Sequence, residues 1–130
     1  PGFDAGTPSK PGAKLERLQI VKGWIDAEGK THEEVIHAAG DSETVATVDP
    51  ATCASNGQGH QTLCGVYKDT SYEPGQQAFY YARAIEVPTC RWSTRKCNAA
   101  APDDKPEGCS DESIAETVQQ RAVSSPIWVD

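Results

Sequence analysis

The sequence predicts a mainly β fold, an immunoglobulin-like β-sandwich with one short helix near the C-terminus. Glycine and proline together make up 20 of the 130 residues (11 plus 9), which favours many short elements over a few long helices. Apolar side chains recur at every second position in several segments, which is the period of a strand. Residues that favour turns separate these segments.

The first fourteen residues are rich in Gly, Pro, Ser and Lys and show no periodicity. This composition is typical of a linker that leads into a domain. A chain of 130 residues suits one domain of ordinary size. We therefore expect a linker or disordered lead-in over residues 1–14 and a single β-sandwich domain over residues 15–130.

Four strands are predicted in the first half of this domain. Residues 15–25 alternate apolar side chains on both parities, as in a strand that is partly buried on both faces, and a turn follows at 26–29. Further strands are expected at 33–38, at 44–48, where β-branched residues recur, and at 63–68. Together these segments suggest an antiparallel meander.

The strongest predicted element is the segment QAFYYARAIEV at residues 77–87. One parity carries large side chains together with Arg83, and the other carries mostly alanines together with Glu86. A strand packed between two layers has this pattern. We therefore expect a central strand here. Because such an apolar strand should not hold polar side chains without partners, Arg83 and Glu86 are candidates for a buried ion pair or an interface.

The C-terminal part predicts a short helix followed by a strand. Ser113 and Glu116 match a capping box, and Ile114, Val118 and Ala122 follow at a spacing of four residues. Residues 125–129 then predict an edge strand whose tryptophan, Trp128, packs at the border of the core.

The five cysteines predict disulfides rather than a metal site. No two of them form a C-x-x-C pair, the close spacing that a structural zinc site requires. Cys53 and Cys64 bracket a polar, glycine-rich loop, while Cys90, Cys97 and Cys109 fall in a second polar segment. Each segment is expected to be a stapled loop. The fifth thiol could stay free, pair with another part of the protein, or link two chains.

The net charge and the expected compartment exclude some classes of partner. The formal charge is 12 minus 19, or −7, which argues against a nucleic-acid partner. No apolar run approaches the roughly 20 residues that span a bilayer. The chain has no methionine and opens on Pro-Gly, so we expect an export signal to lie upstream. Disulfides indicate a periplasmic or extracellular location.

We assign no catalytic residue, metal ligand or cofactor to this chain. The G-x-S-x-G, P-loop and H-E-x-x-H patterns are absent from the sequence, and its acidic pairs fall in stretches typical of solvated loops. Calcium ligation and a Cys/His catalytic pair are less favoured alternatives. Three tryptophans and four tyrosines offer surface for sugar stacking, although core packing is the favoured explanation because a small sandwich buries most such rings.

Three stretches form a longer pattern: residues 18–24 with Asp26 and Gly29; residues 78–81 with Arg83, Glu86, Pro88, Thr89 and residues 91–94; and residues 121–122 with residues 125–128. This pattern resembles the extreme C-terminal part of the bacterial domain-of-unknown-function family 3604. The resemblance covers most of residues 15–129. It departs from the family at Cys90, where members often carry proline, at Val123, where they often carry tryptophan, and in an insertion over residues 95–112.

The resemblance implies large exported proteins whose N-terminal part looks like a PHP-type metal-dependent phosphoesterase. The metal ligands of this phosphoesterase-like part would lie upstream, so we assign no metal ligand to this chain. We therefore expect a non-catalytic C-terminal accessory domain that packs on or positions the upstream domain. The expected contact residues are Arg83, Glu86, Arg91 and Trp92. The alternative is a secreted adhesion or carbohydrate-binding module that uses exposed aromatic side chains.

Overall fold

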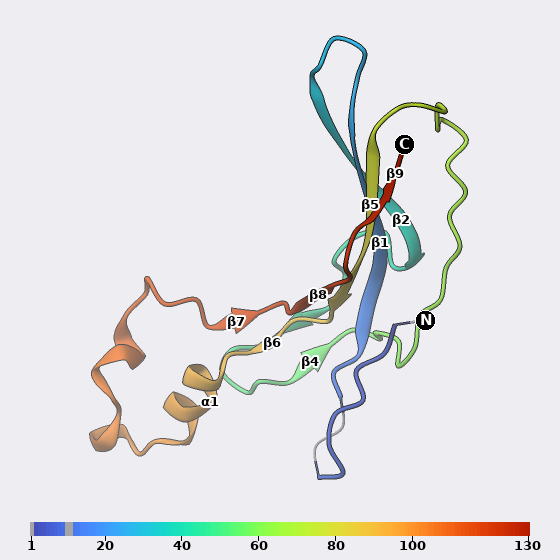
Figure 1. Ribbon diagram of the computed structural model, residues 1–130. Helices are drawn as coiled ribbons and strands as arrows, with labels where there is room; N and C mark the ends of the chain where they lie inside the picture. Colours follow the sequence, from blue (N-terminus) through green and yellow to red (C-terminus); the bar gives the residue numbers. More distant parts are fainter. Residues whose placement is uncertain (1, 10–11) are drawn as a thin grey trace.

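The chain is mainly antiparallel β in the computed structural model, which describes residues 2–9 and 12–130 (Figure 1). A five-stranded sheet carries the fold, and two smaller two-stranded ribbons accompany it. This confirms the predicted mainly β class, whereas the immunoglobulin-like sandwich stays a prediction. No helix among the described residues is long and apolar enough to cross a membrane.

The main sheet contains the two longest strands that the sequence predicts. Its order is β2 (Thr31–Gly40), β1 (Leu15–Ile25) and β5 (Ala78–Glu86), and the free edge of β5 pairs with both β8 (Arg121–Val123) and β9 (Ile127–Val129). All pairings are antiparallel. The predicted central position of β5 is therefore confirmed, as is the C-terminal edge strand.

A tight turn joins β1 to β2 and extends the hairpin beyond the other strands (Figure 1). The Asp26 carboxylate accepts hydrogen bonds from the backbone N–H groups of Glu28 and Lys30, and the backbone of Asp26 also pairs with Lys30. Gly29 has a φ of +81°, a conformation that glycine adopts without a steric cost. These contacts fix the register of the hairpin.

The segment between β5 and β8 extends from the sheet as an arm (Figure 1). It contains the ribbon of β6 (Thr89–Cys90) and β7 (Thr117–Val118), the helix α1 (Trp92–Ala99), and two short 3-10 turns at Pro102–Asp104 and Glu107–Ser110. The ribbon of β3 (Thr47–Val48) and β4 (Ser55–Asn56) lies between β2 and β5 in the sequence.

Two disulfides hold these outer segments. Cys53 pairs with Cys90 and Cys97 pairs with Cys109, while Cys64 is free and exposed. The expectation that Cys53 and Cys64 close one loop is wrong, because Cys53 is joined across 37 residues to β6. The second pair joins α1 to the 3-10 turn that follows it.

The predicted helix around residues 113–122 is wrong in position, since α1 begins at Trp92 and the region instead contains β7 and β8. Ser113 does not cap a helix, because its N–H and hydroxyl groups both donate to the Asp111 carboxylate. The β-branched pair Thr117 and Val118 joins the ladder with β6.

Two of the predicted strands also differ. The strand expected at 44–48 is limited to Thr47–Val48. The strand expected at 63–68 is wrong, because only Leu63 forms a β-bridge there, with Gly2. That bridge places a described part of the predicted linker against the domain; residues 1, 10 and 11 of the linker lie outside the described residues. The linker role stays a prediction.

The apolar core is small. The buried apolar residues are Leu15, Val21, Ala46, Leu63, Ala78, Ile85, Val87 and Cys90. Two ionisable residues of β1, Glu16 and Lys22, are buried with them at 0% and 2% exposure. Because charged groups are rarely buried without partners, the contacts of these two side chains determine how the loops pack.

The two disulfides should stabilise the domain unequally. Each pair is removed in a Cys64→Ser background, which prevents thiol–disulfide exchange. Replacing Cys53 and Cys90 by serine should lower the free energy of unfolding by about 4 kcal/mol. Replacing Cys97 and Cys109 should lower it by about 3 kcal/mol, because the first pair closes the longer loop. Urea unfolding of the three proteins measures the difference. A larger loss for the second pair would contradict this loop-length account, and non-reducing peptide mapping checks the connectivity.

Candidate functional site

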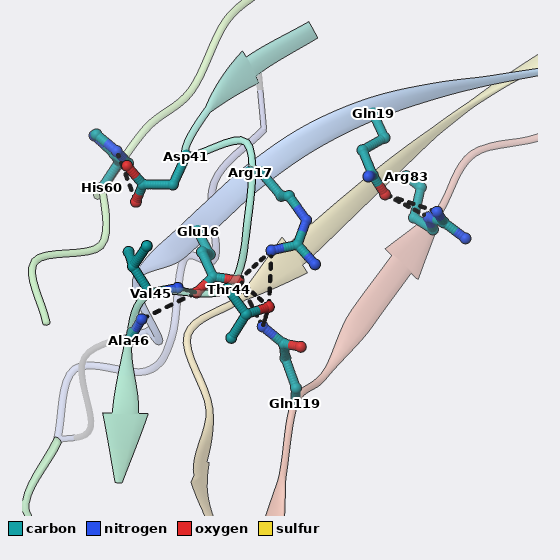
Figure 2. Close-up of polar contacts among 10 residues, drawn as sticks. All are labelled: Glu16, Arg17, Gln19, Asp41, Thr44, Val45, Ala46, His60, Arg83 and Gln119. Carbon is teal, nitrogen blue, oxygen red and sulfur yellow. Dashed lines mark hydrogen bonds and ion pairs between the residues drawn. The ribbon is translucent and has the colours of Figure 1, made fainter. Parts of the chain in front are cut away.

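A buried carboxylate near the start of β1 organises the polar interior of the domain (Figure 2). Glu16 lies where the pairing of β1 with β5 shifts register. Five donors surround its carboxylate: Arg17 Nη1, Thr44 Oγ1 (3.1 Å) and Gln119 Nε2 (2.7 Å) on Oε2, and the backbone N–H groups of Val45 (3.2 Å) and Ala46 (3.4 Å) on Oε1.

This arrangement holds three separate parts of the chain together. Thr44 belongs to the segment after β2, and Gln119 lies between β7 and β8, 103 residues from Glu16. A carboxylate that accepts five hydrogen bonds has little capacity left to take a proton from a substrate. The Glu16 cluster is therefore suited to fixing structure rather than to acid–base chemistry.

A second buried charge, Lys22, lies six residues after Glu16 in β1. Lys22 Nζ forms an ion pair with Asp69 Oδ2 at 2.6 Å, and Tyr80 donates its hydroxyl to the same oxygen at 2.6 Å. Ser71 donates from its N–H and hydroxyl groups to Oδ1, at 2.8 Å each. Lys22 Nζ also lies 5.0 Å from the centroid of the Trp24 ring. These contacts fix the loop that follows residue 68 against the sheet.

The Lys22 cluster shifts the protonation of two of its members. The Lys22 ammonium and the Tyr80 hydroxyl lower the pKa of Asp69 well below its ordinary value of 3.8. Burial and the Asp69 carboxylate raise the pKa of Tyr80 above its ordinary value of 10.0. Both directions keep Asp69 ionised and Tyr80 protonated, which is the state that holds the cluster together.

The four predicted contact residues do not form one site. Arg83 donates from Nε (2.9 Å) and Nη2 (2.7 Å) to Gln19 Oε1 on the neighbouring strand, so it has a partner within the domain (Figure 2). Glu86 is half-buried, and burial together with the nearby charge of Asp4 raises its pKa. Arg91 and Trp92 lie at the start of α1 on the arm.

Trp92 is open to solvent, with 75% of its surface exposed. Arg91 is also exposed, and both line a cavity of about 660 Å³ beside Thr89 and Arg95. Glu86 lines a different cavity, of about 350 Å³, with Leu15. The interface role of the four residues stays a prediction.

The described residues bring no three His, Cys, Asp or Glu side chains close enough to hold a metal ion. His32 contacts the Asp26 carboxylate at 2.5 Å and stacks on Trp24. His60 and Asp41 form a looser pair at the surface, with 3.8 Å between Nε2 and Oδ2 (Figure 2). The first pair joins β2 to the β1–β2 turn, and the second joins two segments outside the named strands.

One face of the main sheet carries a set of apolar side chains that sequence reasoning did not single out. Directly paired residues of antiparallel strands share a face, and alternate residues of one strand do so too. By this register the set, here named the aromatic face, consists of Val21, Val35, Phe79, Tyr81, Val123 and Trp128. Arg83 and Gln19 lie on the same face.

Several members of the aromatic face are open to solvent. Val35 is 45% exposed, Val123 63% and Trp128 73%. The Trp128 ring contacts Phe79 at 5.1 Å between centroids, and the Phe79 ring stacks on Tyr81 at 6.4 Å. Trp128 therefore lies at the border of the sheet as predicted, but most of its surface is exposed.

The comparison with family models identifies the chain. The model described as a protein of unknown function, DUF3604, matches residues 5–130. The chain belongs to this family. The resemblance predicted from residues 15–129 is confirmed, and the match extends toward the N-terminus. Comparisons with curated proteins and with solved structures return no match.

Replacing Glu16 should be strongly destabilising. Glu16→Ala removes the buried carboxylate that accepts from the half-buried Arg17 guanidinium and Gln119 amide, and we expect a loss of about 3 kcal/mol in the free energy of unfolding. Glu43→Ala removes an exposed glutamate next to Thr44, in the segment after β2. It should change the free energy of unfolding by less than about 0.5 kcal/mol. Urea unfolding checks both values, and equal effects would contradict a supporting role for Glu16.

The Lys22–Asp69 pair should make stability depend on acid pH. Because the folded pKa of Asp69 is lowered, its stabilisation is fully present above its unfolded pKa and is lost as pH falls below about 4. Asp69→Asn should therefore be less stable than the wild type at pH 6, and the difference should narrow toward pH 2.5. The exposed Asp104→Asn serves as control. A difference that stays constant in urea unfolding across this range would refute the linkage.

Proposed function

We propose that the chain is a non-catalytic accessory domain of an exported DUF3604 protein, and that its sheet packs against another domain of the same protein. The observation that carries this proposal is an excess of surface. The chain exposes 9171 Å², whereas a compact monomer of its mass exposes about 6,700 Å². The excess of about 2,500 Å² is larger than the roughly 800 Å² that one partner buries in a standard interface.

The aromatic face is the best candidate for the contact surface. The opposite face of the sheet is partly covered, since Asp69 binds Lys22 and Tyr80 there and Gly2 and Phe3 lie beside Ala84. The aromatic face instead presents Val35, Val123 and Trp128 to solvent. Contiguous apolar surface with polar residues at its border is typical of a protein–protein contact.

The buried charges support a structural role over a catalytic one. Glu16, Lys22 and Asp69 all have close partners within the domain. Catalytic acids and bases instead need a reactive group that faces a space where substrate can bind. An accessory domain requires only a rigid sheet, and these clusters provide rigidity.

The family resemblance suggests the partner. We propose that an upstream PHP-like phosphoesterase domain lies against this sheet, with Arg91 and Trp92 on the arm as a second point of contact. The two disulfides support a periplasmic or extracellular location for the whole protein, because disulfides persist in oxidising compartments.

The alternative function, an adhesion or carbohydrate-binding module, has one observation in its favour. Trp92 and Trp128 are 75% and 73% exposed, and exposed tryptophans stack on sugar rings. The two rings lie on different parts of the fold, one on α1 and one on β9, so they offer two separate platforms rather than one continuous strip.

Hydrogen–deuterium exchange can test the packing proposal. In the full-length gene product, backbone amides of β2, β5 and β9 should exchange more slowly than in the chain alone, because the partner domain covers their face. Val123→Asp should remove this protection by placing a charge in the contact. The control Val66→Asp, at a residue that is 94% exposed and outside the face, should leave it intact.

Both variants are also compared as isolated chains, where surface substitutions should change stability by less than about 0.5 kcal/mol. Equal exchange in the chain and in the full-length protein would overturn the proposal. Protection confined to the arm would move the contact from the sheet to Arg91 and Trp92.

A further inference from the structure

A groove of about 770 Å³ lies at the end of the main sheet nearest the β1–β2 turn and includes part of the aromatic face. Its lining includes Gly23, Ile25, Glu33, Phe79, Trp128 and Asp130. The register pairs Gly23 with both Glu33 and Phe79, and Phe79 with Trp128. Three neighbouring strands and β9 therefore form this groove, and its walls are part of the rigid sheet rather than of a loop.

The absence of a side chain at position 23 shapes the floor of the groove. A Cβ atom built on Gly23 would lie 2.4 Å from Cζ of Phe79, so the Phe79 ring lies directly over the backbone of Gly23. The Trp128 ring is tilted by 52° against Phe79 at 5.1 Å between centroids. Trp128 is 73% exposed, which leaves an aromatic surface free for a ligand to stack on.

The charged side chains around this aromatic surface are mainly acidic. Glu33 and Asp130 line the groove and are both exposed. The third ionisable lining residue, His32, is bound to the Asp26 carboxylate. The whole chain also has a net charge of −7. Aromatic rings beside carboxylates attract cations, and a planar guanidinium can both stack on a ring and donate to a carboxylate.

We infer that this groove accepts an arginine side chain from the partner domain, with its guanidinium stacked on Trp128 and paired with Glu33 or Asp130. The inference rests on the proposed packing of the aromatic face and names the chemistry of one contact within it. Carboxylates only accept hydrogen bonds, so an ionised Glu33 and Asp130 favour a ligand that only donates, as a guanidinium does.

Titrations of the ¹⁵N-labelled chain followed by NMR test this inference directly. The probe is N-acetyl-arginine amide, and its matched control is N-acetyl-citrulline amide, which has a similar planar end group without the charge. The arginine probe should shift the Trp128 indole and Gly23 amide signals saturably. The citrulline probe should bind about tenfold more weakly, since it lacks the charge-assisted contacts.

Two groove variants and one outside control locate the site. Trp128→Ala and Glu33→Gln should each weaken arginine binding at least about threefold, whereas Phe3→Ala, at an exposed aromatic residue beside Ala84 and outside the groove, should leave it unchanged. The dispersion of the amide spectrum shows whether each variant is folded. Glu33→Gln preserves the size of an exposed side chain and keeps the test valid if Trp128→Ala unfolds.

Equal binding of the arginine and citrulline probes, or binding that is lost in Phe3→Ala and kept in Trp128→Ala, would overturn the inference. Saturable binding of xylo- or chito-oligosaccharides at Gly23 and Trp128, without an arginine response, would overturn it in favour of a saccharide site. Protection of the aromatic face in the full-length protein, combined with no arginine response, would reject only this inference and leave the packing proposal standing.

Discussion

Glu16 has no solvent exposure, and its carboxylate joins the segment after β2, the start of β1 and the segment before β8 in one hydrogen-bond cluster. The core offers few large apolar side chains to fix these segments otherwise. Lys22, six residues along the same strand, holds a further loop through Asp69. The two charges act on different loops from one strand. β1 therefore sets the position of most of the outer chain.

Buried charges carry a desolvation cost that an apolar side chain would avoid. The advantage of charged groups here is that their hydrogen bonds fix the directions of their partners. A carboxylate surrounded by five specific donors accepts only one arrangement of its neighbours, whereas an apolar contact tolerates sliding. We interpret both clusters as devices that select one packing of long loops in a domain with a small core. The disulfides serve the arm in a similar way, because the arm contributes little to that core.

The sequence predicted the elements whose pattern is set by burial. The alternation in residues 77–87 was sufficient to locate β5 and its central position, and the β1–β2 hairpin followed from residues 15–38. It failed in two other segments: Ser113 binds Asp111, two residues away, instead of capping a helix, and residues 63–68 form no ladder beyond the bridge of Leu63 to Gly2. Lys22 within an apolar strand was the available signal for its cluster. The Glu16 cluster depends on Gln119, 103 residues away, and had no local signal.

The arrangement of the end strands has a mechanical consequence. β1 begins opposite Glu86 at one end of β5, and β9 ends opposite Ala78 at the other end. Tension between the start of β1 and the end of β9 would therefore shear the pairing of β1 with β5 and that of β5 with β9. Under shear, many hydrogen bonds must break together rather than one by one. If the sheet did give way, the Cys53–Cys90 link would keep the segment between these two cysteines, which are 37 positions apart, from extending. The domain is thus built to resist pulling along its strands.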